Sequence, residues 1–215
     1  LNKQGHRVHQ WDFDTRLGND LEILPDGKLI GMFKVFGPDI NFGGAGGTIK
    51  ILNSNSGVDW QYTYATNNYI AHHDVELLPN GNILFIAWER VSSFTAQSNG
   101  VNTTSDIFPE TLVEVNPTTN QIVWKWNSFD HIVQDFNTNN LNYGIVNENP
   151  QLIDINYNGS ANGGDIMHAN GIDYDETNDI IYLSVNNYSE IWVIDHSTTT
   201  TEAASNSGGN YNKGG

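Results

Sequence analysis

The sequence predicts an all-β protein made of repeated antiparallel sheets. The main observation is a strand–turn–strand unit that occurs twice, because Asp20–Leu29 matches Asp74–Ile83 nearly position for position. The units carry Leu-Pro-Asp-Gly and Leu-Pro-Asn-Gly between apolar residues. Asp, Asn and Gly tolerate the backbone conformations that a tight hairpin turn needs. Each copy therefore predicts two antiparallel strands joined by a short turn.

A second pair of strands follows each copy. Thr48–Leu52 and Val58–Tyr62 follow the first copy. Leu112–Val115 and Ile122–Trp126 follow the second. These segments are rich in β-branched and aromatic residues, which favour strands, and a polar turn separates the members of each pair. Each complete round therefore predicts four strands.

A third round begins at Gly171–Tyr174 and continues through Ile180–Ser184 and Glu190–Ile194. We interpret Arg7–Trp11 as the last strand of an earlier round. Four short strands in each repeat of roughly 40 to 55 residues are typical of a β-propeller blade. The predicted fold class is therefore all-β, with about three β-propeller blades.

Closed propellers have about four to eight blades, so three blades do not close a ring. We expect residues 1–215 to form a single partial β-propeller domain that starts inside one blade and stops inside another. The remainder of the propeller would come from missing sequence or from another chain. The chain begins with Leu1, and its first residues do not form a signal peptide, so we expect a processed chain or a piece of a longer one.

Polar insertions interrupt the repeats at 91–110 and 129–162. The first is rich in Ser, Thr and Asn and is predicted to be a surface loop. The second is more mixed, and Asp130–Phe136 in it is interpreted as a short helical turn. Asn41–Gly47 is glycine-rich and is predicted to be a flexible connection. It lacks the Gly-Lys-Ser/Thr ending of a phosphate-binding loop, which argues against a nucleotide site.

The composition excludes several classes of function. Nine basic and 25 acidic residues give a net charge of −16, which argues against nucleic acid or an anionic membrane as the main partner. No Cys is present, so disulfides, thiolate metal sites and Cys nucleophiles are excluded. No apolar run approaches the roughly 18 residues of a membrane span.

The candidate site residues are histidines at the starts of repeats. His72 and His73 are expected just before the first strand of the second round, and His168 just before the third. Inner ends of different blades converge on the central channel of a propeller, so His73 and His168 are expected to face each other. Two alternatives stay open: these histidines brace the blade entrances, or they bind a metal. His196 lies in a polar run, where a role in a turn is favoured.

The sequence also resembles the arylsulfotransferase family, also called aryl-sulfate sulfotransferases. The segments that carry the resemblance occur in the family's order and cover most of the chain: His72–Leu84, Asp130–Asp135, Asp165–Tyr174, Ser189–Thr200 and Gly208–Gly215.

The resemblance implies a six-bladed propeller with a metal-free site that needs no cofactor. Its substrates would be a small-molecule aryl sulfate and a phenol, and a sulfated histidine would carry the sulfuryl group in a ping-pong reaction. His73 and His168 match the family's His-Asp and Asp-Trp-x-His-x-Asn motifs and would bind or polarise that group, although Ile166 replaces the Trp. His72 and Asn170 are the expected substrate-binding residues. Family members are typically exported, which implies a periplasmic or extracellular location.

The chain departs from the family pattern at two points. The family's catalytic Arg falls on Asn186, which can donate a hydrogen bond to an oxyanion but brings no charge. The family's nucleophilic His would lie beyond Gly215. The alternative function is therefore a non-catalytic propeller that serves as a binding or structural assembly module.

Overall fold

The computed structural model describes residues 1–215 and is dominated by short strands. The strands are β1 (Leu17–Ile23), β2 (Leu29–Lys34), β3 (Gly47–Leu52), β4 (Val58–Thr63), β5 (Tyr69–Leu77), β6 (Ile83–Glu89), β7 (Glu110–Asn116), β8 (Gln121–Asn127), β9 (Ile132–Val133), β10 (Ile153–Asp154), β11 (Ala169–Asp175), β12 (Ile180–Val185) and β13 (Glu190–Asp195). The helices are α1 (Ser93–Ser98), α2 (Thr200–Ala203) and the 3-10 turns η1 (Ser128–His131), η2 (Val146–Glu148) and η3 (Asn186–Tyr188). The predicted all-β class is confirmed.

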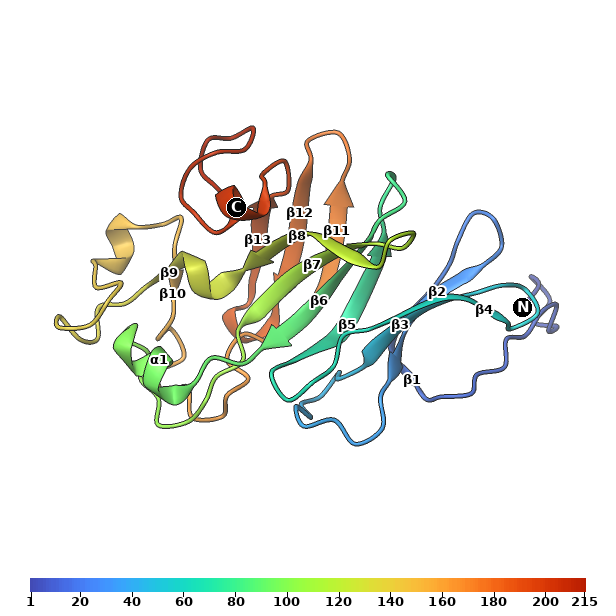
Figure 1. Ribbon diagram of the computed structural model, residues 1–215, viewed down its shortest axis with the longest axis horizontal. Coiled ribbons are helices and arrows are strands. Elements are labelled where there is room, and N and C mark those ends of the chain that lie inside the picture. Colours follow the sequence, from blue (N-terminus) through green and yellow to red (C-terminus); the bar gives the residue numbers. More distant parts are fainter.

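Three antiparallel sheets follow one another along the chain (Figure 1). The first contains β1–β4 and the second β5–β8, each with its strands in sequence order. The third contains only β11–β13, so the third predicted round has three strands. The pair β9 and β10 forms a small parallel sheet beside them. The sheets do not close into a ring.

The repeated hairpin turn has the same hydrogen bonds in both copies. The Leu24 N–H donates to the Lys28 carbonyl, and the Leu78 N–H donates to the Asn82 carbonyl, each at 2.9 Å. Gly27 and Gly81 have φ values of 83° and 84°, a region that an L side chain rarely adopts. The turn predicted from Pro-Asp-Gly and Pro-Asn-Gly is therefore found in both places.

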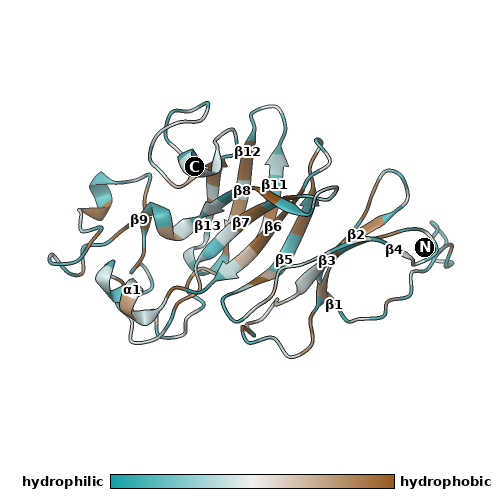
Figure 2. Ribbon diagram, viewed as in Figure 1, coloured by the Kyte–Doolittle hydropathy of each residue, from teal (hydrophilic) through white to brown (hydrophobic).

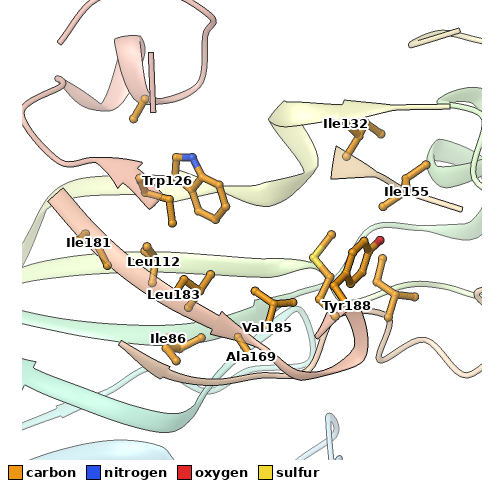
Figure 3. Close-up of a cluster of buried hydrophobic side chains, with 14 of the residues drawn as sticks. Ile86, Leu112, Trp126, Ile132, Ile155, Ala169, Ile181, Leu183, Val185 and Tyr188 are labelled. Carbon is orange, nitrogen blue, oxygen red and sulfur yellow. The ribbon is translucent and has the colours of Figure 1, made fainter. Parts of the chain in front are cut away.

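Apolar side chains fill the spaces between neighbouring sheets. Between the first and second sheets, Met32 and Ile49 pack with Phe85 and other buried residues. Between the second and third sheets, side chains such as Ile86 and Leu183 form a larger cluster (Figure 3). Figure 2 shows the apolar character concentrated along the central strands of these sheets. Each fully buried side chain of this size contributes roughly 1.5–3 kcal/mol, so the sheets are held face to face mainly by burial.

The outer strand predicted at Arg7–Trp11 is wrong. These residues form no strand ladder. Instead, Trp11 packs on a small cluster of the first sheet and donates its indole N–H to the Asn53 carbonyl at 3.0 Å. The Asp12 N–H donates to Ser56 Oγ at 2.8 Å. Side-chain anchoring thus replaces backbone pairing in this segment.

Both insertions contain more structure than the sequence predicts. The expected surface loop 91–110 forms α1, buries Ala96, Val101 and Ile107, and ends inside strand β7. Its polar composition hides these few apolar anchors. The helical turn expected at 130–136 is wrong for most of its length, because η1 ends at His131 and Ile132–Val133 form β9. None of the helices has the length and apolar character that a membrane crossing needs.

Candidate active site

His72 and His73 lie inside strand β5 and not before it, which corrects the expected position. The pairing of β5 with β6 shifts between His72 and Val75, so the strand bulges there. His73 has a φ of 52°, and its N–H donates to the Gly44 carbonyl at 3.1 Å. A bulge re-aims the side chain that it contains. This bulge gives two adjacent histidines different surroundings.

His168 lies directly before strand β11, as predicted. It has a φ of 54°, and its carbonyl accepts the Asn186 N–H at 3.3 Å. Its Nδ1 lies 2.5 Å from Asp165 Oδ2. A non-glycine residue in the left-handed region costs on the order of 1–3 kcal/mol, and such residues cluster at functional sites. His73 and His168 both have this conformation.

The structure brings His73 and His168 together. Their ring centroids lie 4.9 Å apart with an interplanar angle of 78°. Each ring uses its Nδ1 for a hydrogen bond within the protein, to His72 and Asp165 respectively. Neither Nε2 has a protein partner, and neither is sealed from solvent. Two neighbouring rings, one on β5 and one directly before β11, therefore each have an Nε2 without a protein partner.

The glycine-rich segment 41–47 is packed against these histidines, although the sequence predicts a flexible connection. Ala45 pairs with His72 as an isolated bridge. A Cβ at Gly44, where φ is 88°, would overlap the His73 ring. A Cβ at Gly43 would lie 3.9 Å from His168 Cε1. The glycines thus allow the backbone to form a wall beside both rings.

His72 is wholly buried behind His73. Its ring stacks on Trp88, with centroids 3.5 Å apart and an interplanar angle of 11°. Its Nδ1 lies 2.9 Å from His73 Nδ1, and its Nε2 lies 2.8 Å from Glu110 Oε2. Both nitrogens of this expected substrate-binding residue thus contact protein groups. Its position suits holding His73 in place.

Glu110 is the central residue that the sequence does not reveal. It is wholly buried at the start of β7, where the expected surface loop ends. Its Oε1 accepts the Trp88 indole N–H at 3.2 Å and the Ala169 N–H at 2.8 Å. Only the register of β6 and β7, which places Glu110 opposite Trp88, would have pointed to it.

Burial keeps this group of side chains uncharged. It lowers the pKa of His72 well below its ordinary value. It also lowers the pKa of His73 to about 4, and the neighbouring His72 and His168 act in the same direction. Burial raises the pKa of Glu110 well above its ordinary value, although the Ala169 N–H opposes this rise. A charge taken out of water is costly, so the neutral forms are favoured at neutral pH.

Asn170 lies two residues after His168, and Asn186 follows β12, where its N–H donates to the His168 carbonyl. Both are exposed, and neither side chain makes a hydrogen bond within the protein. The main-chain contact from Asn186 to His168 is the link that the structure gives between them.

A cavity of about 280 Å³ borders Asp165. Gly164, Ile166, Asn187 and Tyr188 contribute to its lining. Asp165 thus contacts His168 and also lines the cavity, whereas His168 is not part of that lining. No group of three or more histidine and carboxylate side chains is arranged to hold a metal ion.

His196 lies outside the group formed by His72, His73 and His168. Its Nδ1 lies 2.7 Å from Asp179 Oδ1, and its Nε2 lies 3.0 Å from Glu114 Oε2. These carboxylates belong to the β11–β12 turn and to β7, so His196 connects the second and third sheets. The contacts with these two carboxylates raise its pKa despite its burial.

Comparison with known proteins agrees with the resemblance seen in the sequence. The family model described as Arylsulfotransferase (ASST) matches residues 10–202 of the 215-residue chain. No curated protein matches the chain. The family match spans all three sheets and includes His73, Glu110 and His168. The chain therefore belongs to the arylsulfotransferase family.

Proposed function

We propose that this protein transfers a sulfuryl group from an aryl sulfate ester to a phenolic acceptor, with His73 and His168 at the reacting group. The single observation that carries the proposal is the 4.9 Å separation of these two imidazoles, each with a free Nε2. A sulfuryl group has three non-bridging oxygens, so two imidazole rings whose centroids are this close can contact one group together. Membership of the arylsulfotransferase family supports the same chemistry.

The residue types suit this reaction. By analogy with phosphoryl transfer, the transition state is loose, and charge develops on the equatorial and leaving oxygens. Neutral imidazole N–H groups can donate hydrogen bonds to those oxygens, and an imidazole can protonate the departing phenolate. Asp165 fixes the orientation of His168 through its Nδ1. Asn170 and Asn186 would contact the sulfuryl oxygens or the aryl group through their side-chain amides.

The three sheets are proposed to be blades of a six-bladed propeller. Their meander order and face-to-face packing support this arrangement. About three more blades would close the ring. Exposed Ile191 and Val193 on β13 give the third sheet an apolar surface for the next blade. The remaining blades, from further sequence or another chain, would supply the nucleophilic His of the ping-pong reaction.

Other properties follow from family membership. The reaction would need neither a metal nor a nucleotide sulfate donor. Neither nucleic acid nor a membrane is proposed as a partner, in keeping with the charge of −16. The proposed location is periplasmic or extracellular, as is typical of the family.

An assay of the complete protein tests the proposed function. The protein would be mixed with 4-nitrophenyl sulfate and phenol, and release of 4-nitrophenolate would be followed together with formation of phenyl sulfate. Transfer that depends on phenol and is lost without His73 and His168 supports the proposal. The absence of transfer from several aryl sulfates would instead favour a non-catalytic binding or assembly module.

A further inference from the structure

A continuous chain of hydrogen bonds links a buried carboxyl group to the free nitrogen of His73. Glu110 Oε2 lies 2.8 Å from His72 Nε2, and His72 Nδ1 lies 2.9 Å from His73 Nδ1. Glu110 and His72 are wholly buried, so water does not interrupt the chain. His73 Nε2 is its open end, because this nitrogen has no protein partner and is not sealed from solvent.

Two arrangements of protons satisfy every contact in this chain. In the first, Glu110 is a neutral acid that donates to His72 Nε2, His72 donates from Nδ1 to His73 Nδ1, and His73 Nε2 carries a hydrogen. In the second, His72 donates from Nε2 to a Glu110 carboxylate, His73 donates from Nδ1 to His72 Nδ1, and His73 Nε2 has a lone pair. The second arrangement has one proton fewer: two protons shift along the chain of contacts, and the one on His73 Nε2 is given up. A neutral imidazole permits either tautomer.

We propose that Glu110 is a positioning residue whose stored proton, relayed through His72, replaces the proton that His73 gives to the leaving phenolate. This inference rests on the proposed sulfuryl transfer and deepens it. His73 is the group that touches the substrate, whereas Glu110 acts through His72. The chain of contacts converts His73 Nε2 from a donor into an acceptor without breaking a hydrogen bond.

The proton balance closes in each half of the reaction. When the S–O bond of the aryl sulfate breaks, the sulfuryl group passes to the nucleophilic imidazole, and the electron pair stays on the phenolate oxygen. That oxygen takes the hydrogen from His73 Nε2, His73 Nδ1 takes one from His72 Nδ1, and His72 Nε2 takes one from Glu110 Oε2. Attack by the acceptor phenol returns a proton to His73 Nε2 and reverses the shifts.

The surroundings of Glu110 suit both of its forms. Burial raises its pKa well above the ordinary value, which favours the acid before reaction. The carboxylate, once formed, accepts N–H groups from Trp88, Ala169 and His72. The nearest other titratable groups are Asp165, whose charge favours the acid, and His168, whose charge favours the carboxylate. Three donated hydrogen bonds lower the free energy of the buried carboxylate, so that it can form transiently.

The resting proton arrangement can be observed without any substrate. The complete protein labelled with ¹⁵N-histidine would be studied by NMR at neutral pH, where the two nitrogens of each tautomer have distinct shifts. The proposal expects hydrogen on His72 Nδ1 and on His73 Nε2. Hydrogen on His72 Nε2 and His73 Nδ1 would overturn it, because Glu110 would then already be ionised.

Leaving-group dependence tests whether the stored proton is used. Glu110→Gln keeps a donor for His72 and an acceptor for Trp88 and Ala169, but its amide cannot release a proton. With phenyl sulfate, the single-turnover rate of Glu110→Gln should fall roughly 100-fold, the usual scale for general acid catalysis. With 4-nitrophenyl sulfate, whose phenolate needs little protonation, the rate should fall less than about 3-fold. Equal losses with both donors, or no loss with either, would overturn the proposal.

Glu89→Gln is the matched control. Glu89 is a partly buried carboxylate on β6 that contacts Tyr64 and Lys125 and takes no part in the chain of contacts. Its variant should keep the wild-type ratio of the two donor rates. If the wild-type protein transfers from neither donor, the proposed function fails, whereas the NMR result still decides the proton arrangement.

Discussion

Glu110 on β7 holds the main-chain N–H of Ala169, the residue after His168, while its other oxygen contacts His72. One buried carboxyl group therefore connects the second sheet to the third between the two histidines of the candidate site. His73 is tied to this group through His72, and His168 is tied to it through the backbone. Their separation is fixed before any ligand binds, which is the preorganisation that electrostatic catalysis requires.

Removal of either imidazole should abolish most of the transfer. His73→Ala and His168→Ala should each lower the turnover number roughly 100-fold or more. Each variant loses an imidazole that would stabilise the developing charge or transfer a proton. Sulfuryl transfer from 4-nitrophenyl sulfate to phenol measures this. His6→Ala, at an exposed residue, is the control. Rates within about threefold of wild type for both site variants would refute the assigned roles.

Much of this site follows from the sequence because it depends on repeats. The repeated hairpins align their inner strands, which predicts that His73 and His168 approach each other. The sequence does not reveal Glu110, because its contacts depend on strand register and on a neighbouring sheet. The strand predicted at Arg7–Trp11 does not form, because strand-like composition does not guarantee a pairing partner. His73 lies inside β5 and not at its entrance because the strand begins pairing at Tyr69 and resumes at Val75 after the bulge.

Gly44 should be essential for the position of His73. Gly44→Ala places a Cβ on the His73 ring and also imposes a strained φ of 88°. Gly27→Ala is a matched control, because its φ is 83° but a Cβ there would meet no atom within 4 Å. Both variants should lose stability by about 1 kcal/mol from backbone strain. Only Gly44→Ala should lose a further 1–3 kcal/mol or so to overlap, together with activity.

Denaturant unfolding and the transfer assay separate these contributions. The ¹⁵N shifts of His73 would also move in Gly44→Ala and stay unchanged in Gly27→Ala. Equal behaviour of the two variants would show that the wall at Gly44 does not constrain His73.

A cation at position 186 should accelerate transfer. Asn186 follows β12, is exposed and lies against the His168 carbonyl through its N–H. Asn186→Arg would place a fixed positive charge at the position that is proposed to match the family's catalytic Arg, so the charge developing on the sulfuryl oxygens would be stabilised. Single-turnover rates should rise roughly tenfold or more. Asn55→Arg, in the exposed β3–β4 turn, controls for the added charge. A rate that stays unchanged or falls would show that residue 186 does not face the charge that develops on the sulfuryl group.

Two carboxyl groups, on β1 and β5, have raised pKa values in the folded protein. Burial, with help from Asp173, Asp74 and Glu22, raises the pKa of Glu76 to about 7. Burial and the charge of Asp74 raise the pKa of Asp20 to about 6. A raised pKa means that the folded protein binds the proton more tightly than the unfolded chain. The resulting stability is complete below the unfolded pKa and is lost as the pH rises through the folded pKa.

Replacing Glu76 with a neutral isostere should therefore help at high pH. At pH 8, Glu76→Gln should unfold at a higher urea concentration than wild type. Its free energy of unfolding should be higher by on the order of 1 kcal/mol, after allowance for partial solvent exposure. At pH 4 the advantage should vanish, because Glu76 is then protonated in the folded protein. Glu148→Gln, at an exposed position, should differ from wild type equally at both pH values. An advantage of Glu76→Gln that does not change with pH would show that the carboxylate is not destabilised by its position among the inner strands.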